Sequence, residues 1–193
     1  MRSFSSCLLV LFIFVVGICA APCPARTWYA QRSADWGMFP LGNSTTETIA
    51  SAGCAMTSVC MVLATYDIPI NHRVANPMNF NNYLTENAGY VSGDLIVWDA
   101  VSALGNISLD IYQANIEKSQ LKSLIDDCVP VIVNVLGGTH WVLITDYNPD
   151  DLNIWYVNDP YFNYDTYEYN GMIWFLTYKV GAPEESHQVG KSW

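Results

Sequence analysis

The order of helix-forming and strand-forming segments constrains the fold of this chain more than any other feature. Segments with helical character are residues 54–66, 77–87, 95–104 and 117–127. A first strand is expected from Ile107 to Ile111, where apolar and polar residues alternate. The later segments rich in β-branched and aromatic residues are 130–136, 141–147, 154–157 and 172–180. Helices followed by strands predict an α+β fold, in which an N-terminal helical part packs on a C-terminal antiparallel β-sheet.

The segment that follows Ser51 predicts a central, buried helix. Residues 22–50 before it are rich in proline and glycine and are expected to form loops. Ser51 is expected to cap the helix, which is apolar nearly all round up to about Tyr66. This places Cys54 in the first turn, with Gly53 before it to let a substrate approach closely.

Two sequence patterns argue against a bound metal ion. The stretch from Asp146 to Asp151 begins like a calcium loop, but Asp151 stands where glycine is needed and Val157 stands at the twelfth position. We therefore predict a hairpin turn between two strands at this point. The chain has neither C-x-x-C nor H-x-x-x-H spacing, so no zinc site is expected. We expect no metal and no cofactor.

The N-terminus has the pattern of a secretory signal peptide. Arg2 precedes an apolar run over residues 7–16, and small residues follow up to Ala21. We predict a signal peptide at residues 1–20, a domain at 21–181 and a flexible tail at 182–193. The apolar run is shorter than the roughly 20 residues of a transmembrane helix. We therefore expect a secreted protein without a stable membrane anchor after cleavage; an uncleaved anchor is the alternative.

Cysteines and glycosylation triplets fit export. Cleavage after residue 20 leaves Cys23, Cys54, Cys60 and Cys128. If Cys54 stays a free thiol, the other three can form at most one disulfide, and the sequence does not choose the pair. The triplets that begin at Asn43 and Asn106 could carry N-glycans in a eukaryotic host.

The charge balance limits the classes of partner. Eight basic and 18 acidic residues give a formal net charge of −10. Nucleic acids and anionic membranes select for Lys and Arg, so neither is expected to bind. The acidity is explained by solubility, with a preference for cationic substrates as the alternative. We expect a monomer that acts on a peptide or protein substrate.

Histidine is scarce, which narrows the search for a catalytic base. His72 lies in an expected loop and His187 in the tail, whereas His140 opens a strand directly after two glycines. A histidine in that setting is well placed to accept a proton. The matching nucleophile is Cys54, because the start of a helix favours a thiolate and its N–H groups can bind an oxyanion. The alternative for a free cysteine is a buried apolar role, which we expect for Cys60.

Four sequence elements occur in the chain order of papain-like cysteine peptidases. They are Gln31, then Ala52-Gly53-Cys54-Ala55-Met56, then His140-Trp141, and then Asn158-Asp159-Pro160. Over residues 31–180 the chain more closely resembles the Peptidase_C39-like group, whose fold is papain-like. Further stretches that carry this resemblance are Gly89-Tyr90, Pro130-Val131-Ile132-Val133 and Tyr156-Val157-Asn158-Asp159-Pro160.

The resemblance implies a role for each element of the site. Cys54 would attack a peptide carbonyl, His140 would transfer the proton, and Gln31 would stabilise the oxyanion together with the Cys54 N–H. The orienting residue would be Asp159 or Asn158, since papain uses Asn. Neighbours on a strand point to opposite faces, so only one of them can reach His140, and we expect Asp159. The predicted function is a secreted cysteine peptidase; the alternatives are an inactive binding module on the same fold, or a thiol acyltransferase or amidase.

Overall fold

A computed structural model describes residues 22–181 of the chain. The predicted signal peptide at residues 1–20, the predicted tail at 182–193 and His187 lie outside the described residues. Between residues 22 and 181, no helix is both long enough and apolar enough to span a membrane.

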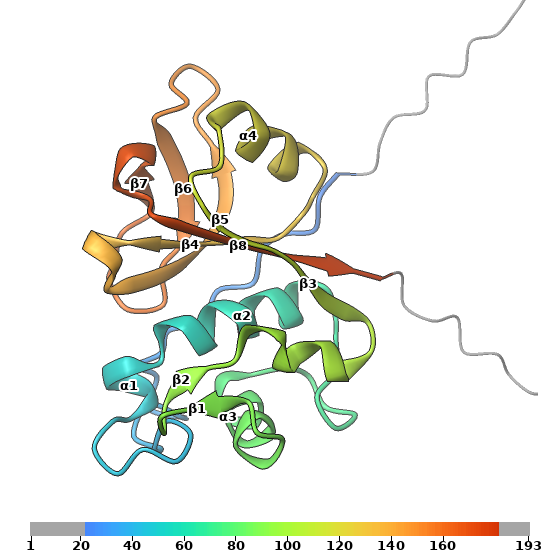
Figure 1. The fold of residues 1–193 in the computed structure, drawn as a ribbon, viewed down its shortest axis with the longest axis vertical. Coiled ribbons are helices and arrows are strands. Elements are labelled where there is room, and N and C mark those ends of the chain that lie inside the picture. Colours follow the sequence, from blue (N-terminus) through green and yellow to red (C-terminus); the bar gives the residue numbers. More distant parts are fainter. Residues whose placement is uncertain (1–21, 182–193) are drawn as a thin grey trace, which may run out of the picture.

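The helical elements of residues 49–104 gather below the sheet in Figure 1. They are α1 (Ile49–Ala52), α2 (Cys54–Thr65), α3 (Pro77–Glu86) and the 3-10 helix η1 (Trp98–Leu104), with a small hairpin of β1 (Tyr90–Val91) and β2 (Leu95–Ile96). The helix α2 lies between this layer and the sheet and packs on β5 (His140–Tyr147).

The sheet has six strands in the order β3-β8-β4-β5-β6-β7, and every neighbouring pair is antiparallel. Its remaining strands are β3 (Ile107–Ala114), β4 (Val131–Val135), β6 (Ile154–Asn158), β7 (Thr166–Glu168) and β8 (Trp174–Val180). The helix α4 (Lys118–Asp126) covers the face opposite to α2 (Figure 1). The arrangement of helices and antiparallel strands is α+β, as the element order predicts.

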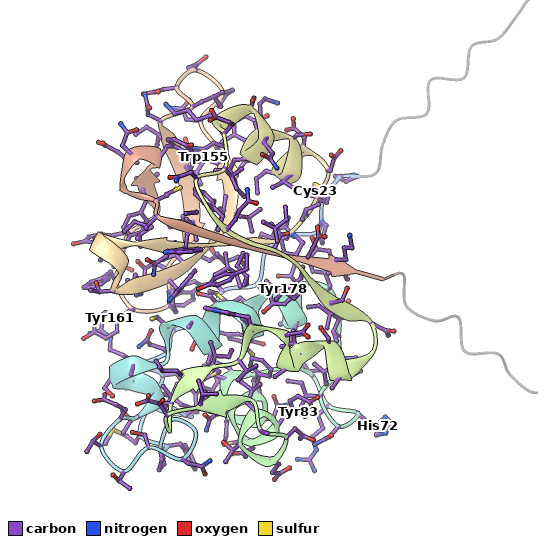
Figure 2. All side chains as sticks on the ribbon, in the orientation of Figure 1. Cys23, His72, Tyr83, Trp155, Tyr161 and Tyr178 are labelled. Atoms are coloured by element: carbon purple, nitrogen blue, oxygen red, sulfur yellow. A yellow bond between two sulfur atoms is a disulfide. The ribbon has the colours of Figure 1, made fainter. Side chains whose placement is uncertain are left out.

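Apolar side chains form two clusters, one on each face of the sheet. Ile132, Leu143 and Leu176 pack with α2, whereas Val133 and Val142 pack with α4 on the other face. This separation follows from the period of two along a strand. Tyr178 lies in the cluster next to α2 (Figure 2). The strand β4 is buried along its whole length, which explains why four of its five residues are valine or isoleucine; the exception is Asn134.

Three local predictions need correction. Ser51 does not cap α2, because it belongs to α1 and forms a capping box with Thr48; Gly53 is the N-cap residue of α2. The expected helix at residues 95–104 begins as the strand β2 and continues as 3-10 helix. The short edge strand β7 was not expected, because its three residues carry no alternating apolar pattern. The hairpin turn after Asp146 is confirmed, since β5 and β6 pair around it.

One disulfide joins Cys23 to Cys128, with 5.3 Å between the Cα atoms. The sequence left this pairing open, and the structure leaves Cys54 and Cys60 as free thiols. The bridge fastens the segment before α1 to the turn between α4 and β4 (Figure 2). The same segment runs beside the end of β6, where the Asn158 side chain donates to the carbonyls of Arg26 and Thr27.

Candidate active site

Cys54 is the first residue of α2 and is partly exposed. The helix start leaves N–H groups without intrahelical partners, so they can bind an anion. Gly53 makes the tight joint between α1 and α2, because a Cβ atom at this position would lie 2.4 Å from the Ile49 carbonyl oxygen. Packing of the helix joint therefore requires glycine at this position; the approach of a substrate beside Gly53 stays a prediction.

His140 is the first residue of β5 and comes directly after a tight loop from β4. Leu136, Gly137 and Gly138 all have positive φ angles, which turns the chain back on itself within a few residues. The side chain of Asn134 spans this loop, since its Nδ2 donates to the carbonyl oxygens of Gly138 at 3.3 Å and His140 at 3.0 Å. The loop and the start of α2 lie at the same edge of the molecule (Figure 1).

Asp159 follows the last residue of β6 and is buried beside His140. Its Oδ1 accepts hydrogen bonds from His140 Nε2 at 2.8 Å and from the N–H groups of Tyr161 at 2.8 Å and Phe162 at 2.9 Å. Its Oδ2 accepts a hydrogen bond from the Tyr167 hydroxyl at 2.7 Å. The structure therefore places Asp159 against His140, while Asn158 points to the segment that contains Arg26.

The surroundings of His140 favour its protonated form. Burial disfavours the charge, but hydrogen bonds and Coulombic attraction from Asp159 and the Cys54 side chain outweigh it and raise the pKa of His140 to about 9. Burial opposes ionisation of Asp159 as well, yet the donors His140, Tyr167 and the Tyr161 N–H hold its pKa below the usual value. Because Asp159 occupies Nε2, the Nδ1 atom is the ring nitrogen left for Cys54.

Cys54 and His140 line one cavity of about 390 Å³. Its other walls come from the segment before α1, from α1 itself, from the loop after β4 and from the loop after β6; they include Gln31, Ser51, Ala52, Leu136, Thr139, Tyr161 and Phe162. Figure 2 shows Tyr161 at this edge, between the helical layer and the sheet. The Phe162 ring stands edge-on to the imidazole, with 5.3 Å between the ring centroids. The cavity thus presents a thiol, an imidazole and an apolar wall to one bound molecule.

Gln31 lies at the cavity, but its side chain is already engaged. Its Nε2 donates to the carbonyl oxygens of Ile49 at 3.2 Å and Ala50 at 3.0 Å. Its Oε1 is buried and has no hydrogen-bond partner among residues 22–181. The opposite amide orientation would place Oε1 against two carbonyl oxygens, so the donors must face α1. Gln31 can therefore donate to an oxyanion only if one of its Nε2–H groups leaves the carbonyl of Ile49 or Ala50.

Two further cysteine and histidine positions are separate from the cavity. Cys60 is fully buried in α2, and burial raises the pKa of its thiol well above the usual value. It is therefore a poor nucleophile. His72 is exposed and is placed on a different loop (Figure 2).

The sequence interpretation missed several residues that support the site. Asn134 holds the loop before His140, Tyr167 binds Asp159, and the Trp28 indole N–H donates to the Asp159 carbonyl at 2.9 Å. Tyr167 and Trp28 lie far from Cys54 and His140 in the sequence, and no motif connects them. A buried polar residue in the otherwise apolar strand β4 was the one available signal for Asn134.

The model of the Peptidase_C39 like family matches residues 27–179, which include Gln31, Cys54, His140 and Asp159. No curated protein matches the chain.

Proposed function

Since the chain belongs to the Peptidase_C39 like family, we propose that it is a cysteine peptidase that hydrolyses peptide bonds with Cys54, His140 and Asp159. The observation that carries this proposal is the buried His140–Asp159 pair, whose histidine lines one cavity with a free thiol at a helix start. A central helix that presents the thiol to a sheet-borne histidine is the papain-like arrangement.

The first half of the reaction forms an acyl-enzyme. The Cys54 thiolate attacks the carbonyl carbon of the scissile bond, and the negative charge moves onto the carbonyl oxygen. The Cys54 N–H stabilises that oxygen, and Gln31 Nε2 joins it by giving up one of its two carbonyl partners. The protonated His140 then donates its proton to the leaving amine as the C–N bond breaks, which leaves a thioester on Cys54.

The second half of the reaction restores the enzyme. The neutral His140 removes a proton from water, and the resulting hydroxide attacks the thioester carbonyl. The C–S bond breaks, the carboxylic acid product leaves, and Cys54 departs as a thiolate beside the protonated imidazole. Asp159 keeps the imidazole oriented throughout and stabilises its charge through the 2.8 Å hydrogen bond.

The engaged Gln31 favours one alternative, a binding module that keeps the fold without turnover. If Nε2 does not leave the carbonyls of Ile49 and Ala50, the oxyanion loses a donor that is typically worth about 3 kcal/mol in the transition state. A module of this kind would bind peptides in the same cavity but would not cleave them. Secretion of the protein and removal of residues 1–20 are part of the proposal in either case.

Alkylation and peptide digestion test the proposal together. Iodoacetamide should modify Cys54 at neutral pH and leave Cys60 unmodified, because Cys60 is fully buried. The wild type should cleave members of a peptide library, and Cys54→Ala should cleave none. The matched control Cys60→Ala should retain cleavage. An unreactive Cys54, or equal cleavage by the wild type and Cys54→Ala, would refute the peptidase; binding without cleavage by both would support the module.

A further inference from the structure

The carboxylate of Asp159 is fully enclosed by protein, and its two oxygens are held differently. Oδ1 accepts three hydrogen bonds, from His140 and from the N–H groups of Tyr161 and Phe162. Among residues 22–181, the donor to Oδ2 is the Tyr167 hydroxyl at 2.7 Å. The Asp159 side chain has no exposed surface, so bulk water does not reach Oδ2 in this structure.

Tyr167 is held in place from two sides. It lies on β7, where it pairs with Trp155 of β6, and it packs against the apolar cluster on the α4 side of the sheet. The Tyr164 ring packs edge-on against it, with 5.9 Å between the centroids, and itself stacks on Phe162. Burial and the Asp159 charge hold the pKa of Tyr167 far above its usual value, so its hydroxyl stays a donor.

We propose that Tyr167 is a positioning residue for the reaction, because its hydroxyl keeps the Asp159 carboxylate ionised and turned with Oδ1 toward His140. The inference rests on the proposed function of Cys54, His140 and Asp159. Without the hydroxyl, Oδ2 would be a buried acceptor with no donor, which favours its protonation. In the wild type, Tyr167 does not touch the substrate; it acts on the Cys54 thiol through Asp159 and His140.

The direction of the effect follows from the groups around the pair. Asp159 is faced by His140 from β5 and by Tyr167 from β7, and His140 is faced by Cys54 from α2. The Arg32 guanidinium lies over the Tyr161 ring, with 4.3 Å to the ring centroid, and donates to the Tyr161 carbonyl. Loss of the Tyr167 hydroxyl removes a donor that lowers the pKa of Asp159, so that pKa rises. A protonated Asp159 no longer stabilises the imidazolium beside the Cys54 thiolate, so reactivity is lost at a higher pH.

The test is the pH profile of Cys54 alkylation by iodoacetamide, measured between pH 3.5 and 8 on the full chain. The alkylation rate should fall on the acidic side of this profile, which we call the acid limb. Tyr167→Phe should shift the acid limb to higher pH by about one unit, because a hydrogen bond to a charged group corresponds to roughly one pKa unit. On the limb, the rate should be about tenfold slower than in the wild type at the same pH. The matched control is Tyr178→Phe, which also removes a buried hydroxyl, here one that donates to the Trp98 carbonyl at 2.9 Å. It should keep the wild-type limb.

A double-mutant cycle separates positioning from general stability. In the Asp159→Asn background, Tyr167→Phe should cause no further shift of the limb, because the carboxylate on which it acts is gone. An unchanged limb in Tyr167→Phe, or an equal shift in Tyr178→Phe, would overturn the proposal. If Tyr167→Phe does not fold, 3-fluorotyrosine at position 167 supplies a stronger donor and should move the limb to lower pH; no movement would again overturn it. A wild-type Cys54 that resists alkylation would instead refute the proposed function itself.

Discussion

Removal of the disulfide between Cys23 and Cys128 should destabilise the folded chain by several kcal/mol. The two residues are 105 positions apart, so the bridge closes a loop over more than half of the chain. The chain-entropy relation for a loop of this length gives about 4.8 kcal/mol at 25 °C. For a domain of this size each kcal/mol corresponds to about 2–4 °C, so the melting temperature should fall by roughly 10–20 °C.

The effect should fall mainly on the unfolded state. In the folded chain, the segment next to Cys23 is also held by hydrogen bonds to the end of β6. Asn158 binds the carbonyls of Arg26 and Thr27, and Trp28 binds the carbonyl of Asp159. These contacts remain after the bridge is removed, so the folded structure should change little while the unfolded chain gains conformational freedom.

The assay is urea denaturation of Cys23→Ser/Cys128→Ser, with Cys54→Ala in both the variant and its reference to prevent thiol exchange. The free energy of unfolding should fall by about 3–5 kcal/mol. Treatment of the Cys54→Ala reference with dithiothreitol should give the same decrease. A loss below about 1 kcal/mol would refute the chain-entropy argument, since surface substitutions alone can produce a change of that size.

Four further predictions concern the site and the helix joint next to it. The alkylation rate of Cys54 with anionic iodoacetate should fall as pH rises through about 9, because His140 loses its charge there, whereas neutral iodoacetamide should show no such fall; equal profiles would contradict the pairing of Cys54 with His140. The pKa of His140 is higher in the folded chain, at about 9, than its ordinary value of 6.5, so protonation of His140 stabilises the fold. This stabilisation should be fully present below about pH 6.5 and lost as pH rises through about 9, and urea unfolding at a series of pH values measures it. Phe162 lines the cavity, so Phe162→Ala should lower kcat/KM by roughly tenfold for peptides with a large apolar residue beside the cleaved bond. The kcat/KM for peptides with a small residue there should not change. An equal loss for both kinds of peptide would argue against an apolar subsite. Gly53→Ala should destabilise the folded chain by about 1–3 kcal/mol in thermal unfolding, because the new Cβ atom would lie 2.4 Å from the Ile49 carbonyl oxygen. The control Gly171→Ala should leave the stability unchanged, because no atom lies within 4 Å of its new Cβ atom.

The sequence predicted the long elements well because their patterns are local. The all-round apolar run after Cys54 became the buried helix α2, and the β-branched runs became β4, β5, β6 and β8. The start of β5 at His140 was also predicted, since two glycines precede it. Short elements were missed: α1 has four residues and β7 has three, and tertiary contacts decide such segments more than their own sequence does.

The candidate residues of the site could be identified from the sequence, but the side chains that hold them in place could not. The alternation of side chains along a strand predicted that only one of Asn158 and Asp159 reaches His140, and the structure places Asp159 there, with 2.8 Å between Oδ1 and the imidazole Nε2. The disulfide partner of Cys23 could not be chosen, because a pairing depends on the distance between residues far apart in the chain. The hydrogen bonds of the Gln31 amide could not be predicted for the same reason, since its donors face carbonyls of α1 that only packing brings near.

By itself, the sequence determined an α+β chain with a thiol at a helix start and a histidine at a strand start, because both follow from the pattern of apolar, β-branched and glycine residues along a continuous segment. Only the tertiary structure decided which groups surround that pair. The Tyr167 hydroxyl on Asp159, the Asn134 amide across the loop before His140 and the Cys23–Cys128 bridge all join residues from separate elements. Such contacts arise when the two faces of the sheet bury their apolar residues against α2 and α4, which fixes the strand ends and the side chains that meet there.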